Sequence, residues 1–79
     1  MDCDLNKIDE VVMALLYLTM FEHHGITRAW KNHDWDALNR LHEKGWILYP
    51  KGKSKSVGVT NEGRQAAKDL FQKHFGISV

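Results

Sequence analysis

The hydrophobic pattern of this chain changes period at Gly45, and this change is the strongest constraint on its fold. Before Gly45, apolar residues recur at helical spacing and predict a helix over residues 34–44. After it, Trp46–Tyr49 is aromatic and branched, which favours a strand. Glycine at such a junction is typical of a helix end. The face of the helix expected to be buried holds Trp35, Leu38 and Leu41.

A first helix is predicted over Leu5–Phe21, where apolar residues also follow three- and four-residue spacings. Asp4 or Asn6 can cap its start, and Gly25 can end it. This segment is apolar around more of its circumference than one core face requires. We therefore expect it to be central in the fold or part of a dimer interface.

A short helix of about two turns is predicted for Ile26–Asn32. Thr27 is its expected cap, and Ala29 and Trp30 form its expected buried side. With residues 34–44, the chain would then have three helices before its first strand.

The second half is expected to form a β-hairpin followed by a helix. Trp46–Tyr49 and Ser56–Thr60 are the two strands, and the polar segment Lys51–Lys55 joins them. Thr60 or Asn61 then caps the last helix. The inner face of that helix is expected to hold Ala66, Ala67, Leu70, Phe71, His74 and Phe75.

The length of 79 residues, with 43% hydrophobic residues, predicts one small globular domain over residues 1–79. Its single cysteine excludes an intramolecular disulfide framework. A domain of this size buries only about 60% of its unfolded surface, so a partner subunit would help to stabilise it. Large side chains must fill its core, and we expect Trp30, Trp35 and Trp46 there.

The N-terminus lacks a basic start and an apolar run before a cleavage site, so we expect no signal peptide. The longest apolar run, Val11–Leu18, is shorter than the roughly 20 residues that span a bilayer. We expect a cytoplasmic protein with no membrane contact.

The order of predicted elements resembles the winged helix-turn-helix of MarR-like and PadR-like regulators. The residues that carry this resemblance are Leu38, Leu41, Lys44-Gly45-Trp46-Ile47, and Val59-Thr60 followed by Gly63. The resemblance implies an α+β, mostly α fold. Its parts are three N-terminal helices, a two-stranded β-hairpin wing and a C-terminal helix.

A second resemblance covers nearly the whole chain. The segments Ala29-Trp30-Lys31, Asp34–Leu38 and Leu41–Gly45 look like the core of a small uncharacterised bacterial domain family. No activity is established for that family, so this resemblance implies a family relationship but no particular function.

Binding of duplex DNA is the first functional hypothesis, and the winged-helix resemblance favours it. Three lysines of the predicted wing alternate with small residues and can face one phosphate backbone. On the helix over residues 34–44, Asn39 and Arg40 are expected to face outward and can read bases in the major groove. The acids Asp36 and Glu43 on that face oppose DNA docking. The DNA-binding candidates are Thr27, Arg28, Lys31, Asn39, Arg40, Lys51, Lys53 and Lys55.

A protein-interaction or homodimerisation module of the same fold, without DNA binding, is the second hypothesis. The excess apolar surface of the first helix favours it. Acidic residues outnumber basic ones in residues 1–25, and the reverse holds in residues 51–79. This asymmetry fits either a basic functional face or attraction between the two ends of the fold. The candidate interface residues are Val12, Leu16, Met20, Leu70 and Phe71.

Catalysis and metal binding are not expected. No nucleophile, acid and base form a recognisable set, and no glycine-rich loop cradles a phosphate. His23 and His24 are adjacent and would diverge on a helix, so they do not chelate one ion. We expect no cofactor. A small-molecule sensor with tryptophans lining its pocket is a third hypothesis that no motif demands.

Overall fold

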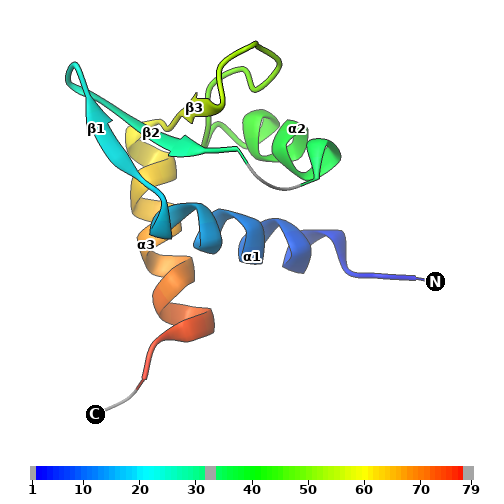
Figure 1. Cartoon of the computed structure of the whole chain (residues 1–79). Helices are drawn as coiled ribbons and strands as arrows, with labels where there is room; N and C mark the ends of the chain where they lie inside the picture. Colours follow the sequence, from blue (N-terminus) through cyan, green and yellow to red (C-terminus); the bar gives the residue numbers. More distant parts are fainter. Residues whose placement is uncertain (1, 32–33, 78–79) are drawn as a thin grey trace.

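A computed structural model describes residues 2–31 and 34–77 and shows three helices and three strands in these ranges (Figure 1). The strands form one antiparallel sheet in the order β1-β2-β3. In chain order the elements are α1 (Leu5–Leu18), β1 (Phe21–His23), β2 (Ile26–Trp30), α2 (Trp35–Glu43), β3 (Ser56–Gly58) and α3 (Asn61–Phe75).

The expected winged helix, with three N-terminal helices, a two-stranded wing and a C-terminal helix, is wrong. The fold is α+β, but Ile26–Trp30 forms the central strand of the sheet and not a helix. Asn32, the expected end of that helix, lies outside the described residues. Two helices therefore precede β3 in the described ranges, and a hairpin separates them.

That hairpin is built on a two-residue turn at His24-Gly25. Both residues have positive φ, 51° for His24 and 78° for Gly25. Such a turn matches the twist of two antiparallel strands, and it sets the pairing of Phe21 with Arg28. Gly25 thus turns a hairpin instead of ending the first helix, which stops at Leu18.

The predicted wing is only partly present. Ile47 and Val59 form an isolated bridge, and the Leu48 amide donates to the Gly58 carbonyl at 2.9 Å. The longer pairing of β3 is with β2, where Ala29 lies opposite Val57. The two-stranded wing is therefore replaced by a three-stranded sheet that takes its second strand from the segment expected to be helical.

The predicted helix starts are confirmed by their caps. Asp4 accepts a hydrogen bond from the Lys7 amide at 3.1 Å, and Asp34 accepts one from the Ala37 amide at 3.3 Å. Gly45, with φ of 79°, follows α2 as the sequence predicts.

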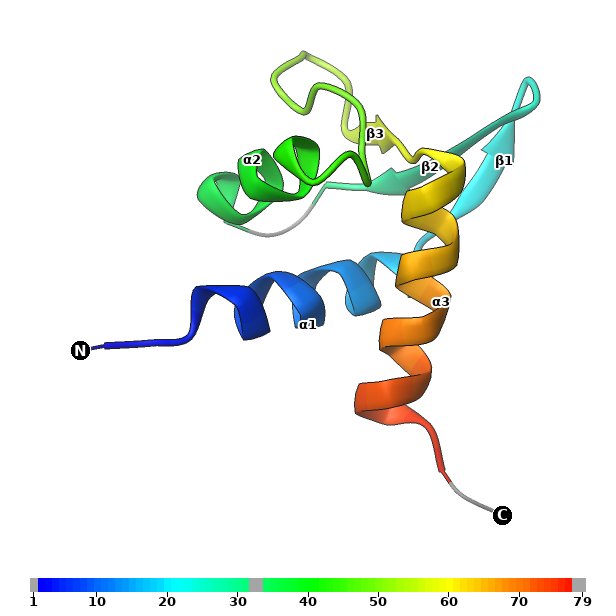
Figure 2. The ribbon, with the colours of Figure 1, turned by 180° about the vertical axis from the view of Figure 1, so that it is seen from behind.

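The first turns of helix α3 lie over one face of the sheet, behind the strands in Figure 1 and in front of them in the reverse view of Figure 2. The rest of α3 packs on α1. The core lies between this face, α1 and α2. It contains Val12, Met13, Leu16, Ala29, Ala37, Leu38, Leu41, Ile47, Val57, Val59 and Ala67.

The tryptophans do not fill this core as expected. Trp30 is 49% exposed and Trp35 is 52% exposed, whereas Trp46 is half-buried against the cluster. Trp30 points outward because side chains alternate along a strand and its neighbour Ala29 takes the inward position. On α2, Ala37 lies on the buried face in place of Trp35.

A fully buried carboxylate joins α1 to α2. Asp9 has no exposed surface, and both of its oxygens accept from Nε of Arg40 at 2.9 Å. Nη2 of Arg40 lies 2.8 Å from Oδ1, and Nζ of Lys44 lies 3.3 Å from Oδ2. Arg40 of α2 and Lys44, the C-cap of α2, thus neutralise one buried anion from α1.

Burial raises the pKa of Asp9, but hydrogen bonds from Arg40 and Lys44 outweigh this effect. The net result is a pKa below the ordinary value of 3.8. A lowered pKa in the folded state stabilises the protein above the ordinary pKa, and the stabilisation is lost as the pH falls through the folded-state value.

Replacing Asp9 with Asn should lower the free energy of unfolding at pH 7 by about 3 kcal/mol, because Arg40 and Lys44 lose their buried counter-ion. Urea unfolding at pH 7 and at steps below pH 4 measures this. The wild type should lose stability more steeply than Asp9→Asn as the pH falls below 3.8.

The control is Asp69→Asn on α3, where the carboxylate is exposed and accepts from Gln65 at 3.0 Å. Its effect should stay within about 0.5 kcal/mol. Equal pH slopes for the wild type and Asp9→Asn would contradict the role assigned to the buried carboxylate.

The start of α3 is fixed by a close approach to Trp46. The Thr60 hydroxyl accepts from the Gly63 amide at 2.9 Å and donates to the Gly45 carbonyl at 2.7 Å. The Trp46 carbonyl accepts from the Thr60 amide at 3.1 Å. A Cβ at Gly63 would overlap this carbonyl group, so only glycine fits there.

We expect Gly63→Ala to lower the free energy of unfolding by about 1–3 kcal/mol or more, because the obstacle is backbone and cannot rotate away. Thermal and urea unfolding measure it. Gly52→Ala is the control, since nothing lies within 4 Å of an added Cβ there. If Gly63→Ala were as stable as Gly52→Ala, the close approach of Gly63 to the Trp46 carbonyl would not constrain the fold.

Candidate functional site

The sheet face opposite α3 has no helix over it among the residues that the structure describes (Figures 1 and 2). Along β2, Ala29 points to the core, so its neighbours Arg28 and Trp30 point to this open face. Register places Phe21 of β1 opposite Arg28, and Ser56 of β3 opposite Trp30. All three strands therefore contribute to one surface.

This surface is hollowed into an open groove of about 470 Å³. It mixes two aromatic rings with cationic, imidazole and hydroxyl groups. The lining residues are Phe21, His23, Arg28, Trp30, Ser54 and Ser56. We call them the sheet-face groove.

The aromatic part of the groove is a pair of tilted, stacked rings. The centroids of Phe21 and Trp30 are 5.1 Å apart, with 31° between the ring planes. Phe21 is half-buried, whereas Trp30 is 49% exposed although it belongs to the central strand. A large apolar side chain held rigidly on an uncovered surface is a feature of binding sites.

The cationic part is Arg28, which Ser56 holds in position. Nε of Arg28 donates to the Ser56 hydroxyl at 2.7 Å, and Nη2 donates to the Ser56 carbonyl at 2.9 Å. The Ser54 hydroxyl lies 3.3 Å from that of Ser56 and extends the network. No carboxylate in the described part of the chain pairs with Arg28, so its charge faces the groove without a counter-ion.

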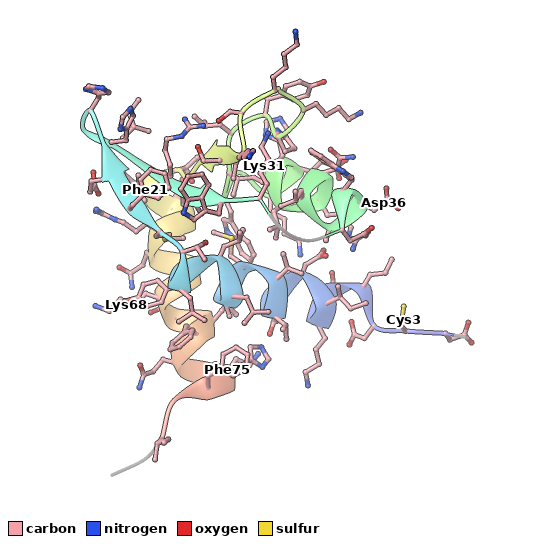
Figure 3. The ribbon with its side chains drawn as sticks, viewed as in Figure 1. Cys3, Phe21, Lys31, Asp36, Lys68 and Phe75 are labelled. Carbon is pink, nitrogen blue, oxygen red and sulfur yellow. The ribbon has the colours of Figure 1, made fainter. Side chains whose placement is uncertain are left out.

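The lysine-rich segment over residues 51–55 adjoins the groove. The Lys31 amide donates to the Lys55 carbonyl at 2.8 Å, and its Nζ donates to the Gly52 carbonyl at 3.3 Å. These bonds fasten the segment to the end of β2, beside Trp30. In Figure 3, where both residues are labelled, Phe21 lies on β1 and Lys31 lies just after the end of β2. The side chains of Lys51, Lys53 and Lys55 are exposed.

The expected DNA-binding residues do not lie on one surface of the structure. Arg28 lies in the groove, and Lys31 lies beside it, with Nζ 5.7 Å from the centroid of the Trp35 ring. Thr27 points the other way and donates to Glu22 at 2.8 Å. On α2, Asn39 is half-buried.

The expectation that Arg40 faces outward is wrong. Its guanidinium is bonded to Asp9, because the two helices pack with the buried carboxylate between them. Helix α2 consequently has no free arginine to place in a major groove.

The expected dimer-interface residues also need correction. Leu16 is fully buried and Val12 is 8% exposed, so both belong to the core of one chain. Met20 and Leu70 are partly buried against that core. Phe71 is half-buried between the rings of Tyr17 and Phe75, at 5.3 and 5.4 Å.

Sequence reasoning misses most of the groove. It places Phe21 at a helix end and Trp30 in the core, and it gives His23, Ser54 and Ser56 no binding role. A local signal that can find them is Gly25, since glycine readily takes the positive φ that a two-residue hairpin turn needs. With that hairpin in place, side-chain alternation along β2 predicts which residues face outward.

Metal-binding clusters and membrane-spanning helices are both absent from the described ranges. Within residues 2–31 and 34–77, no group of three or more His, Cys, Asp or Glu side chains can hold a metal ion. Over the same ranges, no helix is both long enough and apolar enough to cross a membrane.

Comparisons with known proteins agree on kinship. Residues 4–77 match the family described as "Domain of unknown function (DUF6429)". The chain is 45% identical over 75 residues to "Uncharacterized protein y4hR" of Sinorhizobium fredii, and the match covers 95% of this chain and 97% of the relative. No solved structure matches. These matches support the expected kinship with a small family of unknown function and not the winged-helix resemblance, and the chain belongs to the DUF6429 family.

Proposed function

We propose that this protein binds single-stranded nucleic acid on the sheet-face groove. The observation that carries the proposal is the exposed Trp30 ring, stacked on Phe21, beside the guanidinium of Arg28, which has no carboxylate partner in the described part of the chain. Aromatic rings on a sheet face stack with unpaired bases, and a cation beside them binds the phosphate that joins those bases.

Stacking is the first part of the argument. A base laid on Trp30 covers an aromatic face that the protein leaves in water, and such contacts contribute about 1–3 kcal/mol per base. Phe21 supports the ring from the other strand, so Trp30 loses little side-chain freedom when a base binds.

Charge is the second part. Ser56 fixes two N–H groups of Arg28 and so aims the rest of the guanidinium without neutralising it. The exposed lysines of residues 51–55 extend the positive surface beyond Lys31. A backbone running from Arg28 toward this segment would meet one cation after another.

The same residues argue against reading duplex DNA in the major groove. That mode needs an exposed helix or ribbon carrying groups that contact base edges. On α2 the only arginine is bonded to Asp9, and the exposed residues include Asp36 and Glu43. Unpaired bases, in contrast, can reach the aromatic rings of the open sheet-face groove.

Replacing Trp30 with Ala should weaken binding of a fluorescein-labelled oligothymidine by about tenfold or more, because one stacked base is lost. Fluorescence anisotropy measures the Kd, and duplex DNA of the same length should bind more weakly to the wild type. Phe75→Ala on α3 is the matched control, because Phe75 is 45% exposed and lies away from the groove.

Two outcomes would refute the proposal. The first is no binding of oligothymidine or oligouridine by the wild type even at about 50 mM salt, where phosphate contacts are strong. The second is binding that Trp30→Ala and Phe75→Ala weaken equally.

The lysine segment predicts a change in salt dependence. Changing Lys51, Lys53 and Lys55 together to Ala should weaken binding to all sequences. It should also make the plot of log K against log salt shallower, by about 0.7 for each phosphate that the variant no longer neutralises. Titrations from about 50 to about 200 mM salt give the slope.

A double variant, Lys7→Ala with Lys68→Ala, is the control, because these exposed lysines lie on α1 and α3. An unchanged slope in the triple variant would exclude the segment from the binding surface and leave the groove to act alone.

A further inference from the structure

We infer that α1 forms an antiparallel interface with α1 of a second copy of this chain. The inference goes beyond the nucleic-acid proposal and does not depend on it, since it concerns a different surface. Its basis is an apolar stripe on α1 formed by Ile8, Val11, Leu15 and Leu18, which we call the α1 stripe.

The α1 stripe lies on the side of the helix turned away from the core. Ile8 is 37% exposed, Leu18 is 64% exposed, and Val11 and Leu15 are half-buried. None of the four belongs to the core cluster. In Figures 1 and 2, α2 and the sheet lie on one side of α1, and α3 crosses α1 near its C-terminal end and continues past the other side. The contacts of α3 with α1 are made through Tyr17 and Glu10, which lie outside the stripe.

The spacing of the stripe is that of a helix–helix seam. Its residues are separated by three, four and three positions, so they stay on one face of the helix as a and d positions do in a coiled coil. The adjoining surface is an apolar hollow of about 400 Å³, lined by Asp4, Lys7, Ile8, Val11 and Val12. An apolar side chain from another helix fits such a hollow.

The stripe is also complementary to itself. Positions 8 and 18, and positions 11 and 15, are equally distant from position 13. A two-fold axis beside position 13 therefore places Ile8 against the partner's Leu18, and Val11 against the partner's Leu15. Such self-complementarity is what an isologous interface requires.

Charge selects the antiparallel orientation. Asp4, the N-cap of α1, lines the same hollow as Ile8 and Val11 and so lies at one end of the stripe. In a parallel pair the two Asp4 carboxylates would lie at the same end of the seam, where their like charges repel each other. In the antiparallel pair they lie at opposite ends of the seam. The stripe itself contains no charge, which suits an identical partner better than an acidic or basic one.

A mixing experiment tests both the partner and the register. Val11→Lys and Leu15→Glu, each alone, place a charge in the seam and should raise the dimer Kd at least about tenfold. In an equimolar mixture, the new lysine of one variant faces the new glutamate of the other, and the second pair is the native Leu15 against Val11. The mixture should therefore form dimers that neither variant forms alone.

Sedimentation equilibrium of the full chain, from about 1 µM to about 1 mM, measures the association over the affinity range of small interfaces. Ile26→Lys is the matched control, because Ile26 is 49% exposed at the hairpin turn and lies outside the stripe. This control should dimerise like the wild type. Circular dichroism melting checks that each variant is folded.

Three results would overturn the inference. A wild type that stays monomeric up to about 1 mM excludes a second copy as the occupant of the stripe. Folded single variants that dimerise like the wild type exclude the stripe as the interface. Single variants that are monomeric, with a mixture that is monomeric too, exclude the antiparallel register.

Discussion

The buried carboxylate of Asp9 is the interaction on which the arrangement of this molecule depends. A carboxylate with no exposed surface is stable only if cations accompany it, and α2 supplies both Arg40 and Lys44. The same bonds that lower its pKa fix α2 against α1. A second carboxylate, Glu10, ties α1 to α3 through Lys73 and His74, each at 2.9 Å. Helix α1 thus supplies one carboxylate to each of its two helical neighbours.

The ion pairs that hold α2 against α1 also determine which surface of the protein keeps cations free to bind a ligand. Arg40 is used for docking, so α2 keeps few cations for a ligand. The groups suited to binding are found instead on the sheet, whose outer face no described helix covers. Because β2 is central, Arg28 has a strand on each side, and Trp30 is held by its pairing with Ser56 of β3 and by the Phe21 ring. Ser56 adds a further restraint across the strand pair. This combination of rigidity and exposure makes the sheet face the better binding candidate.

The sequence predicts the three helices that are present, because each carries a cap and an apolar period that are local signals. Asp34, Thr60 and Gly45 all act as predicted. The prediction fails at Ile26–Trp30, because five residues fit one and a half helical turns as well as a short strand. What decides the matter is pairing with β3, which is nearly thirty residues away and leaves no local pattern. The same error hides the site, because a helix over Ile26–Trp30 turns the Trp30 ring into the core and leaves Phe21 at a helix end.

The α1 stripe and the sheet-face groove differ enough in chemistry to separate their proposed roles. The α1 stripe is aliphatic and uncharged, so its gain on burial comes from removing apolar area from water, which salt does not weaken. The sheet-face groove combines rings with a cation, so its gain is partly electrostatic and falls as salt rises. Since the stripe lies on α1 and the groove on the strands, pairing of two chains through α1 uses no residue that the groove needs. A single strand of nucleic acid could be long enough to reach both grooves of such a dimer. Once it is bound in one groove, its effective concentration at the second groove is set by the distance between the two grooves. Dimerisation would then strengthen binding while the interactions inside each groove stay the same.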